Sequence, residues 1–298
     1  MIIDTHCHLW EGELVLEDLR NYLTSMAKLL KADPKLVLDG RAERLVDEMN
    51  TAGIDKTVIL ALDYEFLFRG RITFQEYNDK VAEMVNQFTD RLIGFAGIDP
   101  RRGEKALEEL ERCTEKLGLK GVKLWPLTGF YPDEKDFYPF YKLVEEKNIP
   151  ILCHTGSGPV KTYLKYCRPA HVDTIAVDFP DMKIIMAHMG DPWVREALTV
   201  AAKNPNVYTD ISAWESVLRF APLIFCQTLM EARMTCGIDK IVFGSDWPLF
   251  TPVMSLEEWV NGIKNLELPP PLQMMGMPEF SETEKEKILG KNAQKILL

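Results

Sequence analysis

The sequence predicts an α/β chain folded as a (β/α)8 TIM barrel. Short apolar, β-branched runs alternate with stretches of helical periodicity along the 298 residues. Runs that are apolar on both faces are typical of parallel strands covered by helices. Eight such units in a chain of this length favour a closed barrel over an open, doubly wound sheet. Neither a Gly-x-Gly-x-x-Gly nor a Gly-Lys-Ser/Thr phosphate loop is present to support a nucleotide-binding sheet.

Eight segments are predicted to be strands because they are short, apolar and rich in β-branched residues. In chain order they are Ile2–Leu9, Thr57–Leu62, Leu92–Ile98, Gly121–Pro126, Pro150–His154, Lys183–His188, Val207–Ile211 and Lys240–Asp246. Helical periodicity lies between them, at Arg41–Ala52, Thr73–Phe88, Glu104–Leu117, Asp136–Lys147, Pro169–Asp178, Pro192–Lys203, Glu215–Met234 and Leu256–Leu266. The alternation predicts a single catalytic domain over residues 1–298.

Two further segments make the predicted barrel a distorted one. Residues 11–40 form an insertion that is expected to contain an extra helix, either packed against the barrel or lying over the site as a partial lid. Ser281 and Glu284 have the spacing of a capping box, which predicts a C-terminal helix over residues 281–298.

Composition excludes several classes of partner. The formal net charge of −10 and the lack of a Lys/Arg cluster argue against nucleic acid and against an anionic membrane surface. The first residues lack the basic and apolar segments of a signal peptide, and no apolar run is long enough to span a membrane. The six cysteines are scattered without a Cys-x-x-Cys pair, so we expect a reduced, cytoplasmic protein.

Histidines gather where the predicted strands end. Of five histidines, four lie at carboxyl ends of predicted strands: His6 and His8 on the first, His154 on the fifth and His188 on the sixth. Asp246 ends the eighth. In a barrel these ends meet at one rim, where active sites of this fold are built. Imidazole and carboxylate groups together can hold a divalent metal ion, with Asp4 in reach to orient a ring.

The same motifs resemble the amidohydrolase superfamily. The sequence around them resembles the branch that contains aminocarboxymuconate semialdehyde decarboxylase and related hydrolases, lactonases and hydratases. The segments that carry this resemblance are Ile3–His8, Gly121–Leu124, His154–Gly156, Ala187–Gly190, Gly244–Pro248 and Leu289–Ala293. The resemblance implies that His6, His8, His154 and Asp246 bind one divalent ion, zinc or alternatively manganese. It also implies that His188 acts on the substrate, and that the chain forms a homodimer.

Metal chemistry leaves two reactions open. A metal-bound water whose proton passes to Asp246 would hydrolyse a small carboxylated lactone, ester or amide, which is the first expectation. Nonoxidative decarboxylation of an aromatic or unsaturated acid is the alternative, and a non-catalytic metal- or ligand-binding barrel is a remote third. In hydrolysis the substrate carboxylate should bind an arginine. In decarboxylation it should lie beside the metal and Asp246, which is then a candidate acid to protonate the substrate carbon.

Lys123 on the fourth predicted strand is an unusual residue for a barrel interior, because an unpaired ammonium is costly there. A buried ion pair with Asp4 or Asp210 and a substrate contact are two interpretations. A carboxylated lysine that bridges two metal ions, as in binuclear members of the superfamily, is a third.

Several side chains are expected to contact a small carboxylate substrate. Trp10, Trp125 and Trp247 each follow a strand end and suit a flat, unsaturated ligand, although packing at the rim is an equal alternative. Arg69, Arg71 and Arg168 are candidates to bind a carboxylate through two parallel hydrogen bonds.

Overall fold

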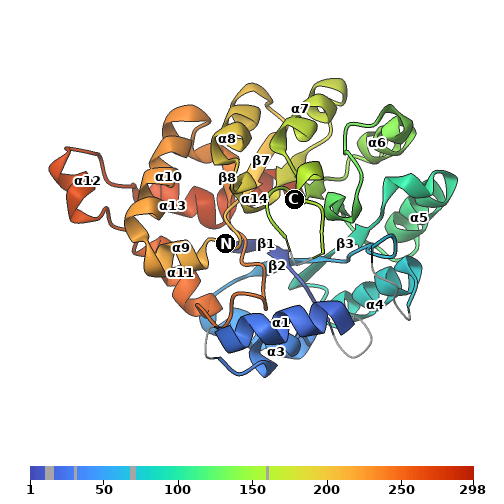
Figure 1. Cartoon of the computed structure of the whole chain (residues 1–298), viewed down its shortest axis with the longest axis horizontal. Coiled ribbons are helices and arrows are strands. Elements are labelled where there is room, and N and C mark those ends of the chain that lie inside the picture. The colour runs from blue at the N-terminus through green and yellow to red at the C-terminus, as the bar shows by residue number, and fades with distance from the viewer. Residues whose placement is uncertain (11–16, 30–31, 68–71, 159–160) are drawn as a thin grey trace.

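Eight parallel strands form the frame of the computed structural model, which describes residues 1–10, 17–29, 32–67, 72–158 and 161–298. They are β1 (Ile3–Cys7), β2 (Lys56–Leu60), β3 (Leu92–Gly97), β4 (Val122–Leu124), β5 (Ile151–Cys153), β6 (Ile184–Met186), β7 (Val207–Asp210) and β8 (Ile241–Val242). Each pairs with the next in chain order, and the helices surround them (Figure 1).

The ring closes where the chain after β8 meets β1. The backbone N–H of Thr5 donates to Phe243 O at 2.9 Å, and that of His8 donates to Trp247 O at 2.8 Å. The N–H of Asp246 donates to His6 O at 2.7 Å. Since β8 itself has only two residues, this seam is irregular. The predicted (β/α)8 barrel and its distortion are therefore confirmed.

The helices follow the predicted alternation closely. In the described residues they are α1 (Glu17–Leu29), α2 (Lys35–Leu38), α3 (Ala42–Ala52), α4 (Phe74–Asn86), α5 (Glu104–Glu115), α6 (Tyr138–Glu146), α7 (Pro169–Asp178), α8 (Val194–Lys203), α9 (Glu215–Phe220), α10 (Pro222–Thr235), α11 (Leu256–Lys264), α12 (Pro270–Met274), α13 (Glu282–Glu286) and α14 (Asn292–Leu297). None of these described helices is long and apolar enough to cross a membrane.

Two predicted helices are interrupted. The segment 215–234 is two helices, because Pro222 lacks an N–H and keeps Ala221 out of the helical region (φ −144°). The C-terminal segment begins with the expected capping box at Ser281 and Glu284, then widens into a π-helix over Lys287–Lys291 before α14. The widened turn leaves Ile288 O to accept from the backbone N–H of Phe243 at 2.9 Å.

Strands end earlier than predicted at the functional rim. The segments 183–188 and 240–246 were expected to be extended throughout, but His188 (φ 59°) and Asp246 (φ 52°) both have left-handed backbones. Few residues other than glycine adopt this conformation, and it is concentrated at functional sites. Periodicity does not reveal it, because the side chains remain buried.

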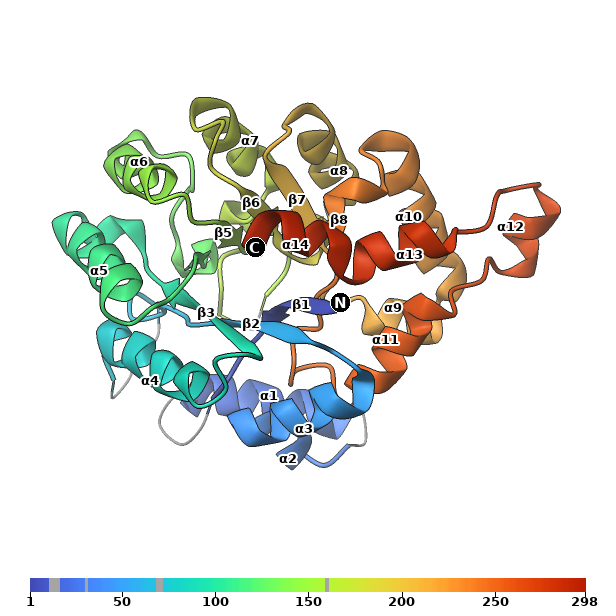
Figure 2. The ribbon, with the colours of Figure 1, turned by 180° about the vertical axis from the view of Figure 1, so that it is seen from behind.

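The two ends of the barrel are filled differently. Apolar side chains from β1, β2, β3, β5, β6 and β8 pack with Ala293 and Ile296 of α14, which lies across the end that faces the viewer in Figure 2. The opposite end carries the polar side chains. The fold therefore separates a dry, stabilising end from an end that is open to ligands.

The insertion 11–40 supports one wall of that open end. Its α1 packs against α2, with Leu23 and Ala27 buried. Gly40 pairs with Trp10 through a backbone hydrogen bond of 3.0 Å, and Val37 O accepts from the Trp10 indole at 3.0 Å. A Cβ on Gly40 would lie 2.8 Å from Trp10 N, so the close approach requires glycine.

Candidate metal centre and active site

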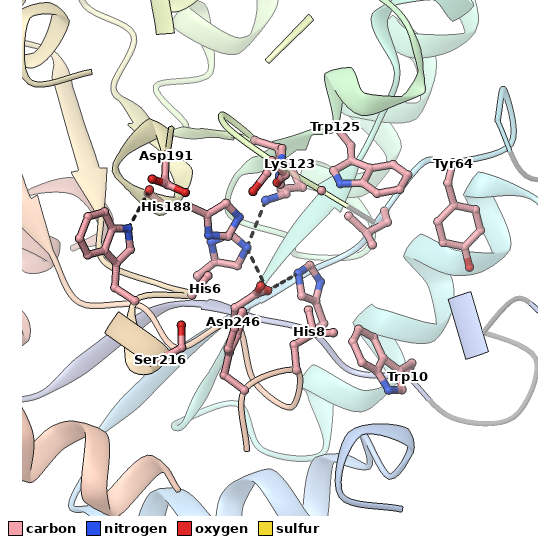
Figure 3. A pocket seen from close by; sticks show the side chains of 18 of the residues that line it. His6, His8, Trp10, Tyr64, Lys123, Trp125, His188, Asp191, Ser216 and Asp246 are labelled. Atoms are coloured by element: carbon pink, nitrogen blue, oxygen red, sulfur yellow. Dashed lines mark hydrogen bonds and ion pairs between the residues drawn. The ribbon is translucent and has the colours of Figure 1, made fainter. Parts of the chain in front are cut away.

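A cavity of about 310 Å³ opens at the carboxyl ends of the strands. Its floor holds His6, His8, Lys123, His154, His188 and Asp246, which come from β1, β4 and the segments that follow β5, β6 and β8. Figure 3 shows His6, His8, Lys123, His188 and Asp246 pointing toward one another. The strand-end rule therefore brings together all five residues with predicted metal or proton-transfer roles.

Three of them form a tight donor set. Nε2 of His8 lies 3.2 Å from Asp246 Oδ1, and Nε2 of His6 lies 3.6 Å from the same oxygen. These ligand atoms of His6, His8 and Asp246 lie within 4.8 Å of one another, and all three residues are buried. Two imidazoles and a carboxylate around one point match the donor chemistry of a Zn²⁺ or Mn²⁺ site.

Hydrogen bonds prepare both imidazoles as ligands. Nδ1 of His6 lies 2.9 Å from Asp210 Oδ2, and Nδ1 of His8 lies 3.2 Å from Leu60 O. Because a carboxylate and a carbonyl only accept, Nδ1 carries the proton in each ring and Nε2 keeps its lone pair. Burial, and then Lys123, lower the pKa of His6 well below its ordinary value, which favours the neutral ligand form.

Asp246 is suited to remain ionised. Burial would raise the pKa of this carboxyl, but its contacts with His8, His6 and His188 hold it below its ordinary value. An anionic oxygen is therefore present at the point where the two Nε2 atoms converge.

His154 lies at the edge of this group. Its Nε2 lies 2.9 Å from Ser157 O, which can only accept, so Nδ1 is the nitrogen left with a lone pair. Burial, and then His188, lower the pKa of His154 well below its ordinary value. The ring is thus a neutral donor that lines the cavity, although it lies outside the tight donor set. Its role as a fourth ligand stays a prediction.

A second cluster joins His6, His188 and Asp210. Asp210 Oδ1 accepts from the backbone N–H of His188 at 2.8 Å, and Oδ2 faces His6. Both carboxylate oxygens accept hydrogen bonds, so Asp210 orients His6 through its ring and His188 through its backbone N–H.

Lys123 is 1 % exposed and points at the donor set (Figure 3). Its Nζ lies 3.3 Å from His6 Nε2. Burial lowers the pKa of Lys123 to about 8, against the opposing charges of Asp210 and Asp246. Of the two predicted ion-pair partners, Asp210 favours the charged form of Lys123 electrostatically. The carboxylate of Asp4 instead accepts a hydrogen bond from Ser245. The carboxylated and substrate-contact interpretations stay open.

Asp4 has a different position from the one expected. Alternation placed it on the same face as the His6 and His8 rings, but its carboxylate accepts from Ser245 Oγ at 2.6 Å and from the backbone N–H of His6 at 3.0 Å. A register shift between Asp4 and Cys7 breaks the alternation. Asp210, at the end of β7, has the ring-orienting role instead.

The cavity walls are largely apolar. Trp10 and Trp125 line them as expected, and the Trp10 ring stacks on His8 with 5.7 Å between centroids. Tyr64, Trp214, Leu249 and Phe250 also line the cavity and were not predicted from sequence. They lie in segments after β2, β7 and β8, whose conformation has no local sequence signal.

Other predicted substrate residues lie elsewhere. Trp247 is fully buried beneath Arg44 and donates to Glu48 at 2.9 Å, so it packs under the rim. Arg168 is half exposed and paired with Glu196 at 2.5 Å, away from the cavity. Arg69 and Arg71 lie outside the described residues.

No described residue between 17 and 40 lines the cavity, so nothing here supports the lid interpretation of that insertion.

One polar residue of the site, Asp191, was missed, and Asp210 was expected only as a possible partner of Lys123. Asp191 lines the cavity three residues after His188, and burial raises the pKa of its carboxyl. Asp210 ends β7, so the strand-end rule applied to every strand would have identified it.

Comparison with known proteins finds similarity over nearly the whole chain. A family model described as "Amidohydrolase" matches residues 3–298. The gamma-resorcylate decarboxylase of Polaromonas sp. strain JS666 is 25% identical over 314 residues, which cover 88% of this chain and 87% of the relative. The 2-amino-3-carboxymuconate-6-semialdehyde decarboxylase of Dictyostelium discoideum is 23% identical over 306 residues, covering 88% and 81%.

A solved structure shares the whole fold. The dihydroxybenzoic acid decarboxylase of Polaromonas sp. JS666, solved with bound manganese and the inhibitor 2-nitroresorcinol, superimposes with a TM-score of 0.70. The alignment covers 99% of this chain and 96% of that chain at 21% identity. With nearly every residue matched by the family model, this chain belongs to the amidohydrolase family.

Proposed function

We propose that the chain is a metal-dependent, nonoxidative decarboxylase of an aromatic or unsaturated carboxylic acid. The observation that carries the proposal is the lining of the cavity, which contains no arginine among the described residues. Of the arginines expected to hold a carboxylate away from the metal, Arg168 is bound to Glu196. Among the described residues that line the cavity, Lys123 and the histidines lie on the floor, at the donor set. A substrate carboxylate is therefore drawn to the reacting point.

The apolar walls support a flat substrate. Trp10, Tyr64 and Trp125 line one side of the cavity (Figure 3), and aromatic faces favour offset or edge contacts with another ring. A volume of about 310 Å³ suits a single substituted ring. The names of the relatives also favour decarboxylation over hydrolysis, which the sequence placed first.

A divalent ion held by His6, His8, His154 and Asp246 would supply positive charge to the substrate oxygens. The manganese of the Polaromonas structure supports Mn²⁺ beside the expected Zn²⁺. One ion per chain is proposed, with Lys123 uncarboxylated.

We assign the proton transfer to His188. Its imidazolium would give a proton to the substrate carbon that bears the carboxylate, and the new C–H bond uses a pair of π electrons. The pair of the breaking C–C bond then returns to the ring or double bond as carbon dioxide leaves. Asp246, whose pKa is held low, acts as a ligand in this scheme, whereas hydrolysis would require it to take a proton from water.

A substrate screen with direct carbon dioxide detection tests the proposal. The chain, supplied with Mn²⁺ or Zn²⁺, is given 2-hydroxybenzoate and muconate-type acids in one arm and lactones and amides in the other. We expect carbon dioxide from an acid with kcat/KM of at least ~10⁴ M⁻¹s⁻¹. Turnover of a lactone or amide without carbon dioxide release would contradict it.

We further propose a cytoplasmic homodimer. The six unpaired cysteines support the reducing compartment, and the homodimer follows from the family resemblance alone. Sedimentation of the purified chain tests the second point.

A further inference from the structure

Three side chains at alternate positions after β7 converge on His188. Asp210, Ser212 and Trp214 are all buried, with exposed fractions of 0%, 0% and 6%. Asp210 Oδ1 accepts from the backbone N–H of His188 at 2.8 Å, and the Trp214 indole donates to His188 O at 3.0 Å. The left-handed backbone of His188 (φ 59°) is therefore held at both its N–H and its C=O.

Ser212 acts on the imidazole itself. Its Oγ lies 2.8 Å from His188 Nδ1, 2.5 Å from Asp210 Oδ1 and 3.1 Å from His6 Nδ1, whose closer acceptor is Asp210 Oδ2 at 2.9 Å. A serine hydroxyl has one proton, and the carboxylate can only accept, so that proton points to Asp210. The hydroxyl oxygen must then accept from His188 Nδ1–H. The backbone oxygen of Ser212, 3.3 Å from the same nitrogen, is a second acceptor.

The assignment leaves one nitrogen for chemistry. With Nδ1 bonded to Ser212, Nε2 of His188 has no hydrogen-bond partner in the part of the chain that the structure describes, and the residue lines the cavity. The other oxygen of Asp210 orients His6 at 2.9 Å. One carboxylate thus positions a metal ligand directly and the proton donor through Ser212.

We propose that Ser212 is a positioning residue that fixes His188 in its Nδ1–H tautomer, so that Nε2 gives and takes the catalytic proton. This inference rests on the proposed function only for the role of His188. The tautomer itself is a property of the resting protein, so it can be measured whether or not a substrate is known.

Nitrogen-15 NMR of the imidazoles measures the tautomer directly. The chain has only five histidines, and the spectrum of His188→Asn identifies the signals that belong to His188. With diamagnetic Zn²⁺ bound, we expect a protonated Nδ1 and an unprotonated Nε2 in the unmutated chain. A protonated Nε2 in the neutral ring would overturn the proposal. The tautomer is measured on the unmutated chain, so the result does not depend on whether a variant folds.

Ser212→Ala tests the role of the hydroxyl. We expect a mixture of tautomers, because only the longer contact of Nδ1 with the backbone oxygen of residue 212, at 3.3 Å, would remain, and a kcat lower by roughly 10–100-fold at saturating metal. A retained Nδ1–H tautomer, or an unchanged kcat, would show that Ser212 only fills space.

Thr209→Val is the matched control. Thr209 is a buried hydroxyl of β7, three residues before Ser212, and its Oγ1 donates to Met186 O at 2.9 Å instead of to His188. It should lower the melting temperature while leaving the tautomer and kcat unchanged. If the unmutated chain releases no carbon dioxide from any acid, the proposed reaction fails, but the NMR result still decides the tautomer.

Discussion

His188 and His6 are neighbours in space with different tasks. Their ring centroids lie 4.8 Å apart, and both are oriented by Asp210. His6 presents Nε2 to the donor set, 3.6 Å from Asp246 Oδ1, whereas His188 has no such contact with that carboxylate. The two rings have different contacts because their backbones differ. His6 lies within β1, whereas His188 follows β6 in a left-handed turn.

This division predicts different outcomes for the two rings. His188→Asn should keep the metal content of the unmutated chain and lower kcat by ~10²–10⁴-fold, because it removes proton transfer and no ligand. Elemental analysis and carbon dioxide release measure the two quantities. His171→Asn is the control, since His171 lies on α7, pairs with Asp133 and does not line the cavity. Loss of metal in His188→Asn would show that His188 is a ligand.

At the level of elements, β1, β7 and β8 approach one another unusually closely behind the site. A Cβ on Gly244 would lie 3.0 Å from the Cβ of His6 and 3.1 Å from the Cβ of Ser212. The glycine that follows β8 therefore sets the spacing between the strand of the metal ligands and the strand that orients them.

Gly244→Ala should disturb the site and the stability together. Crowding of this kind typically costs ~1–3 kcal/mol, and displacement of His6 should weaken metal binding. Chemical unfolding and metal titration measure the two effects. Gly262→Ala in α11 is the control, because there the nearest atom is the end of the Leu218 side chain. Equal metal affinity in Gly244→Ala and the unmutated chain would contradict this account.

A buried carboxylate joins α4 to α5 on the outer layer. Glu109 accepts from Arg112 at 2.8 Å and from Asn78 at 2.8 Å. Burial would raise the pKa of Glu109, but these hydrogen bonds hold it below the ordinary value of 4.5. The ionised form is thus favoured by folding.

Folding stability should depend on pH through Glu109. Because its pKa is lower in the folded chain, its stabilising contribution is complete above pH 4.5 and is lost as the pH falls through the folded value. Glu109→Gln should therefore lose less stability than the unmutated chain between pH 7 and pH 3.5 (about one unit below the unfolded pKa). Urea unfolding at both values measures this. Glu108→Gln, an exposed neighbour on α5, should behave like the unmutated chain.

Across the whole molecule, the donor set spans the seam of the barrel. His6 and His8 belong to the first strand and its end, and Asp246 follows the last, so a bound ion joins the two ends of the fold. A ligand that binds only the folded chain stabilises it by mass action.

Removal of the metal should lower the melting temperature. At a free ion concentration 100 times Kd the stabilisation is about 2.7 kcal/mol, and each kcal/mol corresponds to roughly 2–4 °C in a domain approaching this size. Thermal unfolding before and after chelation, followed by addition of one equivalent of Mn²⁺ or Zn²⁺, measures the shift. His8→Ala should not respond to the chelator. Recovery that requires two ions per chain would instead support a carboxylated Lys123.

The sequence by itself determined the barrel and the floor of its site. Period-two and helical patterns reflect burial, which is local to each element, and parallel strands bring their carboxyl ends to one rim. This is why His6, His8, Lys123, His154, His188 and Asp246 could be identified, and why Trp10 and Trp125 were expected at the cavity.

Only the tertiary structure decided which groups orient and surround them. Asp210 bonds His6 across 204 residues, and a register shift in β1 turned Asp4 away from the rings. Trp247 and Arg168 follow strand ends as Trp10 does, yet one is buried under the rim and the other is bound to Glu196. Such outcomes depend on contacts between distant segments and on left-handed backbones such as that of His188, which burial patterns do not encode.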